Sequence, residues 1–141
     1  MSIVPVPDFS IPVEKQAQNP KSMQKLLLVE DDRVNQMLSR KMLLKAGFEV
    51  DVANDGLEAK KLLACNLYHL VITDIKTPNM DGYALTKHIR DTECLRNLPV
   101  IAVSAYPSSI EKQKALEAGM NEYIAKPYGM HELVETIKLF L

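Results

Sequence analysis

The sequence predicts an α/β fold in which one parallel sheet of five strands carries helices on both faces. After residue 24, short apolar segments typical of buried strands alternate five times with longer segments of helical periodicity. Repeated strand–helix units of this kind form parallel sheets that are covered on both sides. Because the crossovers are right-handed, few layouts remain. Among them, the doubly wound (βα)5, flavodoxin-like order 2-1-3-4-5 places strands one and three side by side.

The strands and helices are expected at defined positions along the chain. Strands are predicted at about residues 25–29, 48–53, 69–74, 99–103 and 121–125. Helices are predicted at about 33–46, after Asn54 or Asp55, from near Asp81 to about Asp91, from near Ser108 to Gly119, and in a last segment that places Met130, Leu133, Val134, Ile137 and Leu141 on one face. Glu58 and Glu111 each stand where they would complete a capping box at a helix N-terminus.

Length and composition indicate one domain preceded by a proline-rich segment. The chain has 141 residues, of which 47% are hydrophobic, and this is enough for a full core. Half of the prolines lie in residues 1–23, so we expect a flexible tail or linker there and a folded domain over residues 24–141. The alternative for the tail is a docked segment that uses Val4, Val6, Phe9 and Ile11.

Charge and hydropathy argue against several classes of function. A net charge of −1 gives no broad attraction to nucleic acid or to an anionic membrane. No apolar run approaches the ~20 residues of a membrane span, and the N-terminus lacks the pattern of a signal peptide. Cys65 and Cys94 have no metal-type spacing and are interpreted as free thiols. We therefore expect a cytoplasmic protein without a nucleic-acid or membrane partner.

Polar residues at the ends of the predicted strands form the candidate site. The third strand ends on Asp74, the first runs into Glu30 and Asp31, and the fifth leads into Lys126. Strands one and three are neighbours in the predicted order, so their acids should meet at the carboxyl edge of the sheet. Clustered carboxylates repel one another, and a divalent cation relieves this. Ligands that are all oxygen favour Mg²⁺.

The same edge of the sheet also has groups suited to a phosphoryl group. Lys126 adds a positive charge, and Ser104, which ends strand four, adds a hydroxyl. Asp74 is then a candidate carboxylate nucleophile that forms an aspartyl phosphate. Such a transfer needs mainly positioning and charge neutralisation from the protein.

Four segments give the chain a resemblance to the receiver domains of two-component response regulators. They are LLLVEDD at 26–32, VITDIKTPNMDG at 71–82, VIAVSA at 100–105 and YIAKP at 123–127. The resemblance covers residues 24–141. It implies a signalling phosphoacceptor, not an enzyme in the usual sense, that catalyses its own phosphotransfer and slow dephosphorylation. The implied donor is a phosphohistidine of a histidine kinase or a histidine phosphotransfer domain. The acid triplet followed by Val34 and Asn35 is similar to the receivers of hybrid sensor kinases.

The resemblance implies a role for each residue of the candidate site. Asp74 would accept the phosphoryl group, and Lys126 and Ser104 would bind its oxygens. The implied Mg²⁺ ligands are Asp31, Asp74, the backbone carbonyl of Lys76 and, through a water, Glu30. Tyr123 would reorient together with Ser104 on activation. The Lys126–Pro127 bond would be cis.

The resemblance also implies which surface of the domain transmits the signal. Phosphorylation would change the face made by helix four, strand five and helix five, and the protein would be a monomer or a weak dimer through that face. Some residues depart from the usual family pattern: Thr77 replaces an apolar residue, Ser104 replaces the commoner threonine, and Tyr106 and Pro107 make the following loop bulky and stiff. None of these changes removes a catalytic group.

Three other functions match parts of the pattern. A Mg²⁺-dependent phosphatase of related fold generally has a second acid two residues after the nucleophile, where this chain has Lys76. An interaction module that is never phosphorylated would not need Asp31, Asp74, Ser104 and Lys126 together. A flavin carrier would have a hydroxyl-rich phosphate loop after strand one, where this chain has acids.

Overall fold

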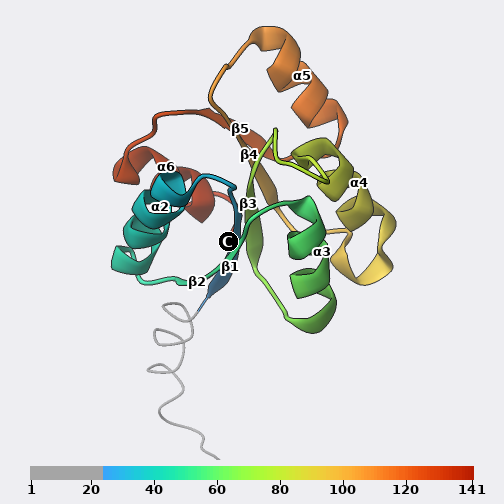
Figure 1. Ribbon diagram of the computed structural model, residues 1–141, viewed down its shortest axis with the longest axis horizontal. Coiled ribbons are helices and arrows are strands. Elements are labelled where there is room, and N and C mark those ends of the chain that lie inside the picture. The colour runs from blue at the N-terminus through green and yellow to red at the C-terminus, as the bar shows by residue number, and fades with distance from the viewer. Residues whose placement is uncertain (1–23) are drawn as a thin grey trace, which may run out of the picture.

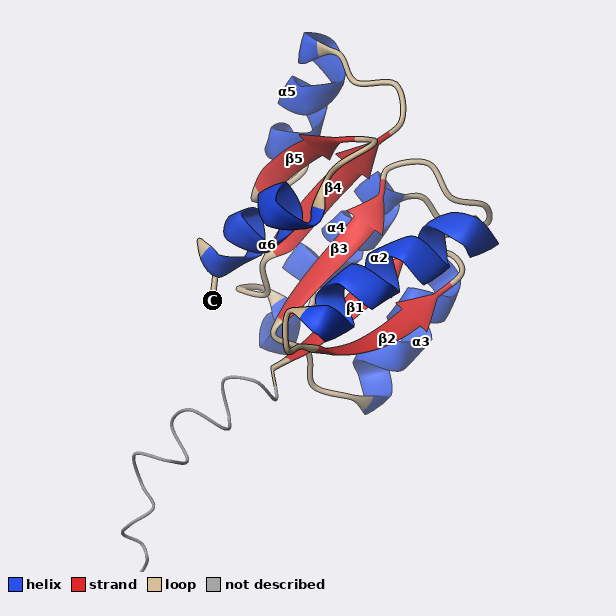
Figure 2. Ribbon diagram, turned by 90° about the vertical axis from the view of Figure 1, so that its left-hand side faces the viewer, coloured by secondary structure: helices blue, strands red, loops and turns tan. Residues whose placement is uncertain are grey.

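Five parallel strands form one sheet between two layers of helices in the computed structural model, which describes residues 24–141 (Figures 1 and 2). The strands are β1 (Lys25–Val29), β2 (Glu49–Ala53), β3 (Leu70–Asp74), β4 (Val100–Ser104) and β5 (Glu122–Ala125). The helices are α2 (Arg33–Lys45), α3 (Gly56–Cys65), α4 (Gly82–Asp91), α5 (Ser109–Glu117) and α6 (Met130–Lys138), with a 3-10 turn η2 (Glu93–Leu95). The strand order β2-β1-β3-β4-β5 confirms the prediction. The expected proline-rich tail, residues 1–23, lies outside the described residues.

The ends of the elements differ from the predicted ones by a few residues. β4 continues to Ser104 instead of ending at Val103, because Ser104 still pairs with Ala125 of β5. The last helix ends at Lys138. The backbone hydrogen bonds after it join residues three positions apart, as in a 3-10 turn, instead of four. Leu141 therefore lies beyond the apolar face on which it was expected. The turn η2 has no counterpart among the predicted elements.

The two faces of the sheet carry separate hydrophobic cores, because successive side chains of a strand point to opposite faces. On one face, α2 and α6 pack over a core that includes Leu26, Leu28, Ile72, Ile101 and Val103. On the other face, α3, α4 and α5 pack over a core that includes Leu27, Val29, Val71, Val100 and Ala102. Figure 1 shows α2 and α6 on one side of the sheet, with α3 and α4 on the other.

The loop that follows β3 is fastened to the N-terminus of α3. The Gly56 N–H donates to the Met80 carbonyl over 3.0 Å, and a Cβ at Gly56 would collide with that carbonyl. Asn79 adopts a positive φ of 67° and its side-chain amide donates to Asp55 over 2.6 Å. At the far end of the loop the Gly82 N–H donates to the Ile75 carbonyl over 2.8 Å. These bonds set the course of the chain directly after Asp74.

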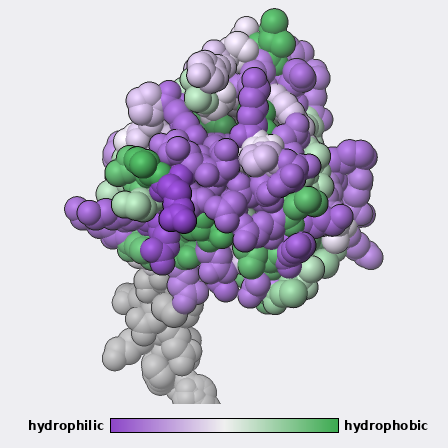
Figure 3. Space-filling view, viewed as in Figure 1, coloured by the Kyte–Doolittle hydropathy of each residue, from purple (hydrophilic) through white to green (hydrophobic). Residues whose placement is uncertain are grey.

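The surface shown in Figure 3 is mostly hydrophilic, and its hydrophobic side chains form small, separate groups. Within residues 24–141, none of the helices combines the length and the apolar character that crossing a membrane requires.

Candidate functional site

The ends of four strands bring the predicted site residues to one edge of the sheet. Val29 of β1 pairs with Thr73 of β3, so the next residues along, Glu30 and Asp74, lie beside each other. Asp74 also pairs with Val103 of β4, one residue before Ser104. Glu30, Asp74 and Ser104 are buried residues, with exposed fractions of 2%, 8% and 6%, whereas Asp31 is exposed. The predicted convergence at the carboxyl edge is therefore found.

Lys126 makes the central ion pairs of the site. Its Nζ lies 2.7 Å from Glu30 Oε1 and 2.9 and 3.0 Å from the two carboxylate oxygens of Asp74. Its backbone N–H donates to the Ser104 carbonyl over 2.8 Å, which ties the segment after β5 to the end of β4. The Lys126–Pro127 bond is cis, as the resemblance implies. Lys126 thus neutralises part of the negative charge of two buried acids.

Burial dominates the electrostatics of Asp74. Loss of water and, after it, the neighbouring Glu30 carboxylate raise the pKa of Asp74, Lys126 lowers it, and the net result is a pKa of about 7. For Lys126 itself, burial lowers the pKa, but the hydrogen bonds to Asp74 and Glu30 outweigh burial and leave a raised pKa. The ionised form of Asp74 is therefore held at a free-energy cost, which a further cation would reduce.

Glu30, Asp31 and Asp74 form a group that fits a divalent cation. Each offers one carboxylate oxygen, and these oxygens lie within 4.8 Å of one another. The donors are all oxygen, which suits Mg²⁺, and one of the three acids is exposed, which leaves room for the waters that Mg²⁺ retains. Glu30 is oriented by the Asp32 backbone N–H, which donates to its Oε2 over 3.0 Å. Asp32 itself caps α2 by accepting from the Asn35 N–H.

A cleft of about 310 Å³ contains most of the candidate residues. Its lining includes Glu30, Asp31, Asp74, Lys76, Ser104, Tyr106, Glu111 and Lys126. Lys76, expected as a backbone ligand, therefore lies at the site. Tyr123 does not line the cleft; its hydroxyl meets Glu111 and Ser108 instead.

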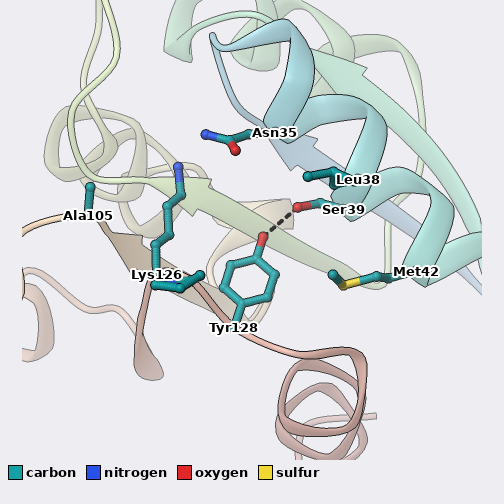
Figure 4. Close-up of a pocket in the computed structure, with 8 residues that line it drawn as sticks. Asn35, Leu38, Ser39, Met42, Ala105, Lys126 and Tyr128 are labelled. Atoms are coloured by element: carbon teal, nitrogen blue, oxygen red, sulfur yellow. Dashed lines mark hydrogen bonds between the residues drawn. The ribbon is translucent and has the colours of Figure 1, made fainter.

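A second hollow of about 330 Å³ adjoins the cleft and shares Asn35, Ala105 and Lys126 with it (Figure 4). It lies between α2 and the segment that follows β5. The hydroxyls of Ser39 and Tyr128 meet across it at 2.6 Å, and the Lys126 side chain extends past Tyr128 toward the side where Asn35 lies. The hollow thus extends the cleft along α2.

Two features of the site were missed by reasoning from the sequence. The role of Glu111 in the cleft was missed because its spacing from Ser108 indicates only a helix cap. The pairing of Ser39 with Tyr128 was missed because the two residues are 89 positions apart and neither belongs to a recognisable motif. No signal in a single sequence indicates such a pairing.

The sequence comparisons identify relatives over most of the chain. The model of the response regulator receiver domain family matches residues 26–138. The sensor histidine kinase RcsC of Escherichia coli is 34% identical over 134 residues, which are 95% of this chain but 14% of RcsC. The polar-differentiation response regulator DivK of Brucella ovis is 34% identical over 82% of this chain and 94% of its own length. The chain therefore spans a small part of RcsC and corresponds to nearly all of DivK.

The similar solved structures are receiver domains as well. One is the receiver domain of the sensor histidine kinase PA1611 from Pseudomonas aeruginosa, with a magnesium ion coordinated in its active-site cleft. It is 36% identical, with a TM-score of 0.79, and the match covers 84% of this chain and 97% of that one. Another is the receiver domain of Ssk1 from Saccharomyces cerevisiae, solved with the histidine phosphotransfer protein Ypd1. It is 29% identical, with a TM-score of 0.77, over 84% and 88% of the two chains. By sequence, fold and the acid cluster at the strand ends, the chain belongs to the response regulator receiver domain family, the phosphoacceptors of two-component signalling.

Proposed function

We propose that Asp74 takes a phosphoryl group from a phosphohistidine of a histidine kinase or a histidine phosphotransfer domain. The observation that carries this proposal is the position of the Asp74 carboxylate: it is buried, paired with Lys126 and grouped with two further acids. Asp31 is exposed. Both carboxylate oxygens of Glu30 are already bonded, one to Lys126 and the other to the Asp32 N–H. Asp74 is therefore the best candidate for the nucleophile.

The transfer is a displacement at phosphorus. An Asp74 oxygen forms a new bond to phosphorus as the bond to the donor's imidazole nitrogen breaks, and the imidazole keeps the electron pair and takes up a proton. Lys126 and Ser104 line the same cleft as Asp74 and would bind the phosphoryl oxygens. Mg²⁺, bound by Asp31, Asp74 and the Lys76 carbonyl, with Glu30 acting through a water, would supply positive charge that keeps Asp74 ionised and neutralises the phosphoryl oxygens.

Replacing the nucleophile tests this assignment. Asp74→Asn keeps the shape of the side chain but removes the nucleophilic oxygen, so incubation with acetyl phosphate and Mg²⁺ should leave it unmodified by intact mass. The wild type should gain one phosphoryl group under the same conditions. The control is Asp91→Asn, which changes an exposed acid on α4 and should be phosphorylated normally. A stoichiometric, Mg²⁺-dependent acyl phosphate on Asp74→Asn would show that another residue is the acceptor.

The exposed side of α2 is the proposed docking surface for the phosphohistidine donor. Val34 and Leu38 are 61% and 53% exposed, and Leu38 also lines the hollow beside the cleft. The hollow adjoins the cleft that contains Asp74, so a donor protein whose histidine enters the cleft from this side would rest on Leu38. Leu38→Glu should therefore slow phosphotransfer from a phosphorylated histidine phosphotransfer protein but not from acetyl phosphate. Leu139→Glu, at an exposed site directly after α6, is the control. Equal rates for all three proteins with the protein donor would contradict this docking surface.

The finer properties of the domain follow from the same site. We infer slow self-dephosphorylation from Lys76 and Tyr106, which lie two positions after Asp74 and Ser104 and line the cleft. In receiver domains these two positions flank the path of the attacking water, and neither residue has a carboxylate or amide that would orient it. The face of α5, β5 and α6 is the proposed output surface of a monomer or weak dimer, and Ile110 and Leu116 of α5 are exposed there.

The small net charge supports a role without nucleic acid, and the free cysteines suit the cytoplasm.

A further inference from the structure

Three side chains at the N-terminus of α5 are joined in an arrangement that the sequence does not predict. Ser108 caps the helix by accepting from the Glu111 N–H over 3.0 Å. In a capping box, the Glu111 carboxylate would return to the Ser108 N–H. Here Glu111 Oε1 instead accepts from the Tyr123 hydroxyl over 2.5 Å, and the Ser108 N–H donates to that same hydroxyl over 3.3 Å. The Tyr123 hydroxyl therefore stands between the two groups of the expected box.

The N-terminus of α3 shows what a glutamate at this spacing does when no tyrosine is near. Asp55 caps α3 by accepting from the Glu58 N–H over 2.8 Å. The Glu58 carboxylate then returns to the backbone, accepting from the Asn54 N–H over 2.5 Å. The residue in the corresponding place before Ser108 is Pro107, which has no N–H. The backbone donor open to Glu111 is therefore the Ser108 N–H of a capping box, and this N–H bonds to Tyr123 instead.

The bond between Glu111 and Tyr123 is partly shielded from water and adjoins the acid cluster. Both residues are half-buried, and Tyr123 packs against the core beneath α3, α4 and α5. Burial raises the pKa of Tyr123, and so does the bond to Glu111. Glu111 also lines the cleft that contains Asp74, Ser104 and Lys126. A change at the cleft can thus reach Tyr123 through Glu111, as well as through the Ser104 side chain, which lowers the pKa of Tyr123.

We propose that Glu111 is the positioning residue for Tyr123: it holds the hydroxyl against α5 and returns to the Ser108 N–H when Tyr123 leaves. The proposal rests on the proposed function of Asp74, because it concerns how phosphorylation there is passed to the output face. In both arrangements the Ser108 N–H and the Glu111 carboxylate have a partner, so α5 remains capped. The cap of α5 therefore does not oppose the change, and a ligand or modification that favours one of the two arrangements shifts the population.

The position of Tyr123 can be followed by ¹⁹F NMR on the full chain with 3-fluorotyrosine at its tyrosines. The Tyr123 resonance is the one that Tyr123→Phe removes. In the unphosphorylated protein, Glu111→Ala should shift this resonance and bring the phenol pKa of Tyr123 down toward its ordinary value. Glu111→Gln keeps an acceptor oxygen and should retain the wild-type resonance. The matched control is Glu117→Ala, which removes an exposed acid from the same helix and should change neither quantity.

Phosphorylation provides the second arm of the test. With acetyl phosphate and Mg²⁺, the wild-type Tyr123 resonance should move toward the position that Glu111→Ala already shows, and the shift in Glu111→Ala should be smaller. A Tyr123 resonance that Glu111→Ala leaves unchanged, or that Glu111→Gln moves as far as Glu111→Ala does, would overturn the proposal. If no protein is phosphorylated, the proposed function of Asp74 fails, while the comparison of unphosphorylated variants still tests Glu111. An unchanged resonance of Tyr68, whose hydroxyl bonds to Asp51 and which does not line the cleft, shows that the fold is intact.

Discussion

Asp74 lowers the stability of the domain that contains it. Its carboxylate is buried beside that of Glu30, and burial is the main reason that its pKa rises to about 7. Lys126 compensates for part of this cost through two short contacts to Asp74 and one to Glu30. A group with this environment is poorly suited to structural work and well suited to binding a cation and a phosphoryl group. Function and stability therefore conflict at this residue.

Removing the charge of Asp74 should stabilise the metal-free protein. The carboxyl has a pKa of about 7 when folded and 3.8 as the reference for the unfolded chain, so between these values the folded state holds a proton that the unfolded state has lost. Stability therefore falls as pH rises from about 4 to about 7, and it stays low above that range. Asp74→Asn lacks this loss and should exceed the wild type by roughly 1–3 kcal/mol at pH 8.

Urea unfolding in the presence of a chelator measures this difference. The two proteins should converge as the pH is lowered toward 4, and added Mg²⁺ should stabilise the wild type more than Asp74→Asn because it binds the ionised site. A wild type that is as stable as Asp74→Asn at pH 8 without Mg²⁺ would contradict the expectation. Asp91→Asn again serves as the control for loss of an exposed acid.

The loop from Asp74 to α4 depends on close approach of two backbone segments. Gly82, the first residue of α4, lies directly against the end of β3, and a Cβ placed on it would be 2.6 Å from the Asp74 carbonyl oxygen and 3.1 Å from the Ile75 Cα. Both neighbours are backbone atoms, which cannot turn aside as a flexible side chain could. The glycine therefore allows α4 to begin beside the nucleophile.

A single methyl group at Gly82 should disturb this loop. Gly82→Ala is expected to lower the free energy of unfolding by roughly 1–3 kcal/mol, the range for overpacking, and to slow phosphorylation because Asp74 shifts with its own carbonyl. Gly129→Ala is the matched control: Gly129 precedes α6, a Cβ there meets nothing within 4 Å, and its stability should stay within about 0.5 kcal/mol of the wild type. Chemical unfolding and timed phosphorylation measure both effects, and equal values for the two variants would contradict the role of Gly82.

The helix caps show how far the sequence could predict the elements. Asp32, Asp55, Asp81 and Ser108 all accept the hydrogen bond expected of a helix cap. These bonds form between residues three positions apart, so the local sequence contains all the information they need. The two predicted capping boxes are not completed at the caps themselves. The Glu58 carboxylate accepts from the Asn54 N–H, one residue before the cap Asp55. The Glu111 carboxylate accepts from Tyr123 on β5, and the sequence does not show which strand will lie beside a given helix end.

The candidate site was more predictable than the details around it. Glu30, Asp74, Ser104 and Lys126 each end or follow a strand, and parallel order alone brings strand ends to one edge. Which of the acids is buried, and by how much, depends on loops whose course is set by contacts such as that between Gly56 and Met80. Those contacts have no local periodicity, so the sequence could indicate the site but not its geometry.

The candidate site and a hydrogen-bond network that holds the fold together lie at opposite edges of the sheet. The carboxyl edge holds the buried acids, and the opposite edge holds a network around Arg90 at the end of α4. The Arg90 guanidinium donates to the backbone carbonyls of Arg96, Leu98 and Gly119 and to the side chain of Asn121. Asn121 in turn accepts from the Val100 N–H at the start of β4. One side chain thus connects α4 to the segments that enter β4 and β5.

Weakening this network should reduce stability without affecting phosphorylation. Arg90→Lys keeps the charge, but a lysine has no planar fork and cannot reach all four acceptors, so carbonyls that are partly buried lose their donors. The free energy of unfolding should fall by roughly 2–4 kcal/mol, while the rate of phosphorylation by acetyl phosphate, which depends on the opposite edge, should stay within about twofold. Arg40→Lys, an exposed position on α2, should change neither quantity.

Phosphorylation of Arg90→Lys must be timed at a temperature where the variant remains folded. A loss of phosphorylation in parallel with stability under those conditions would show that the two edges are coupled and that stability and function do not separate in this fold.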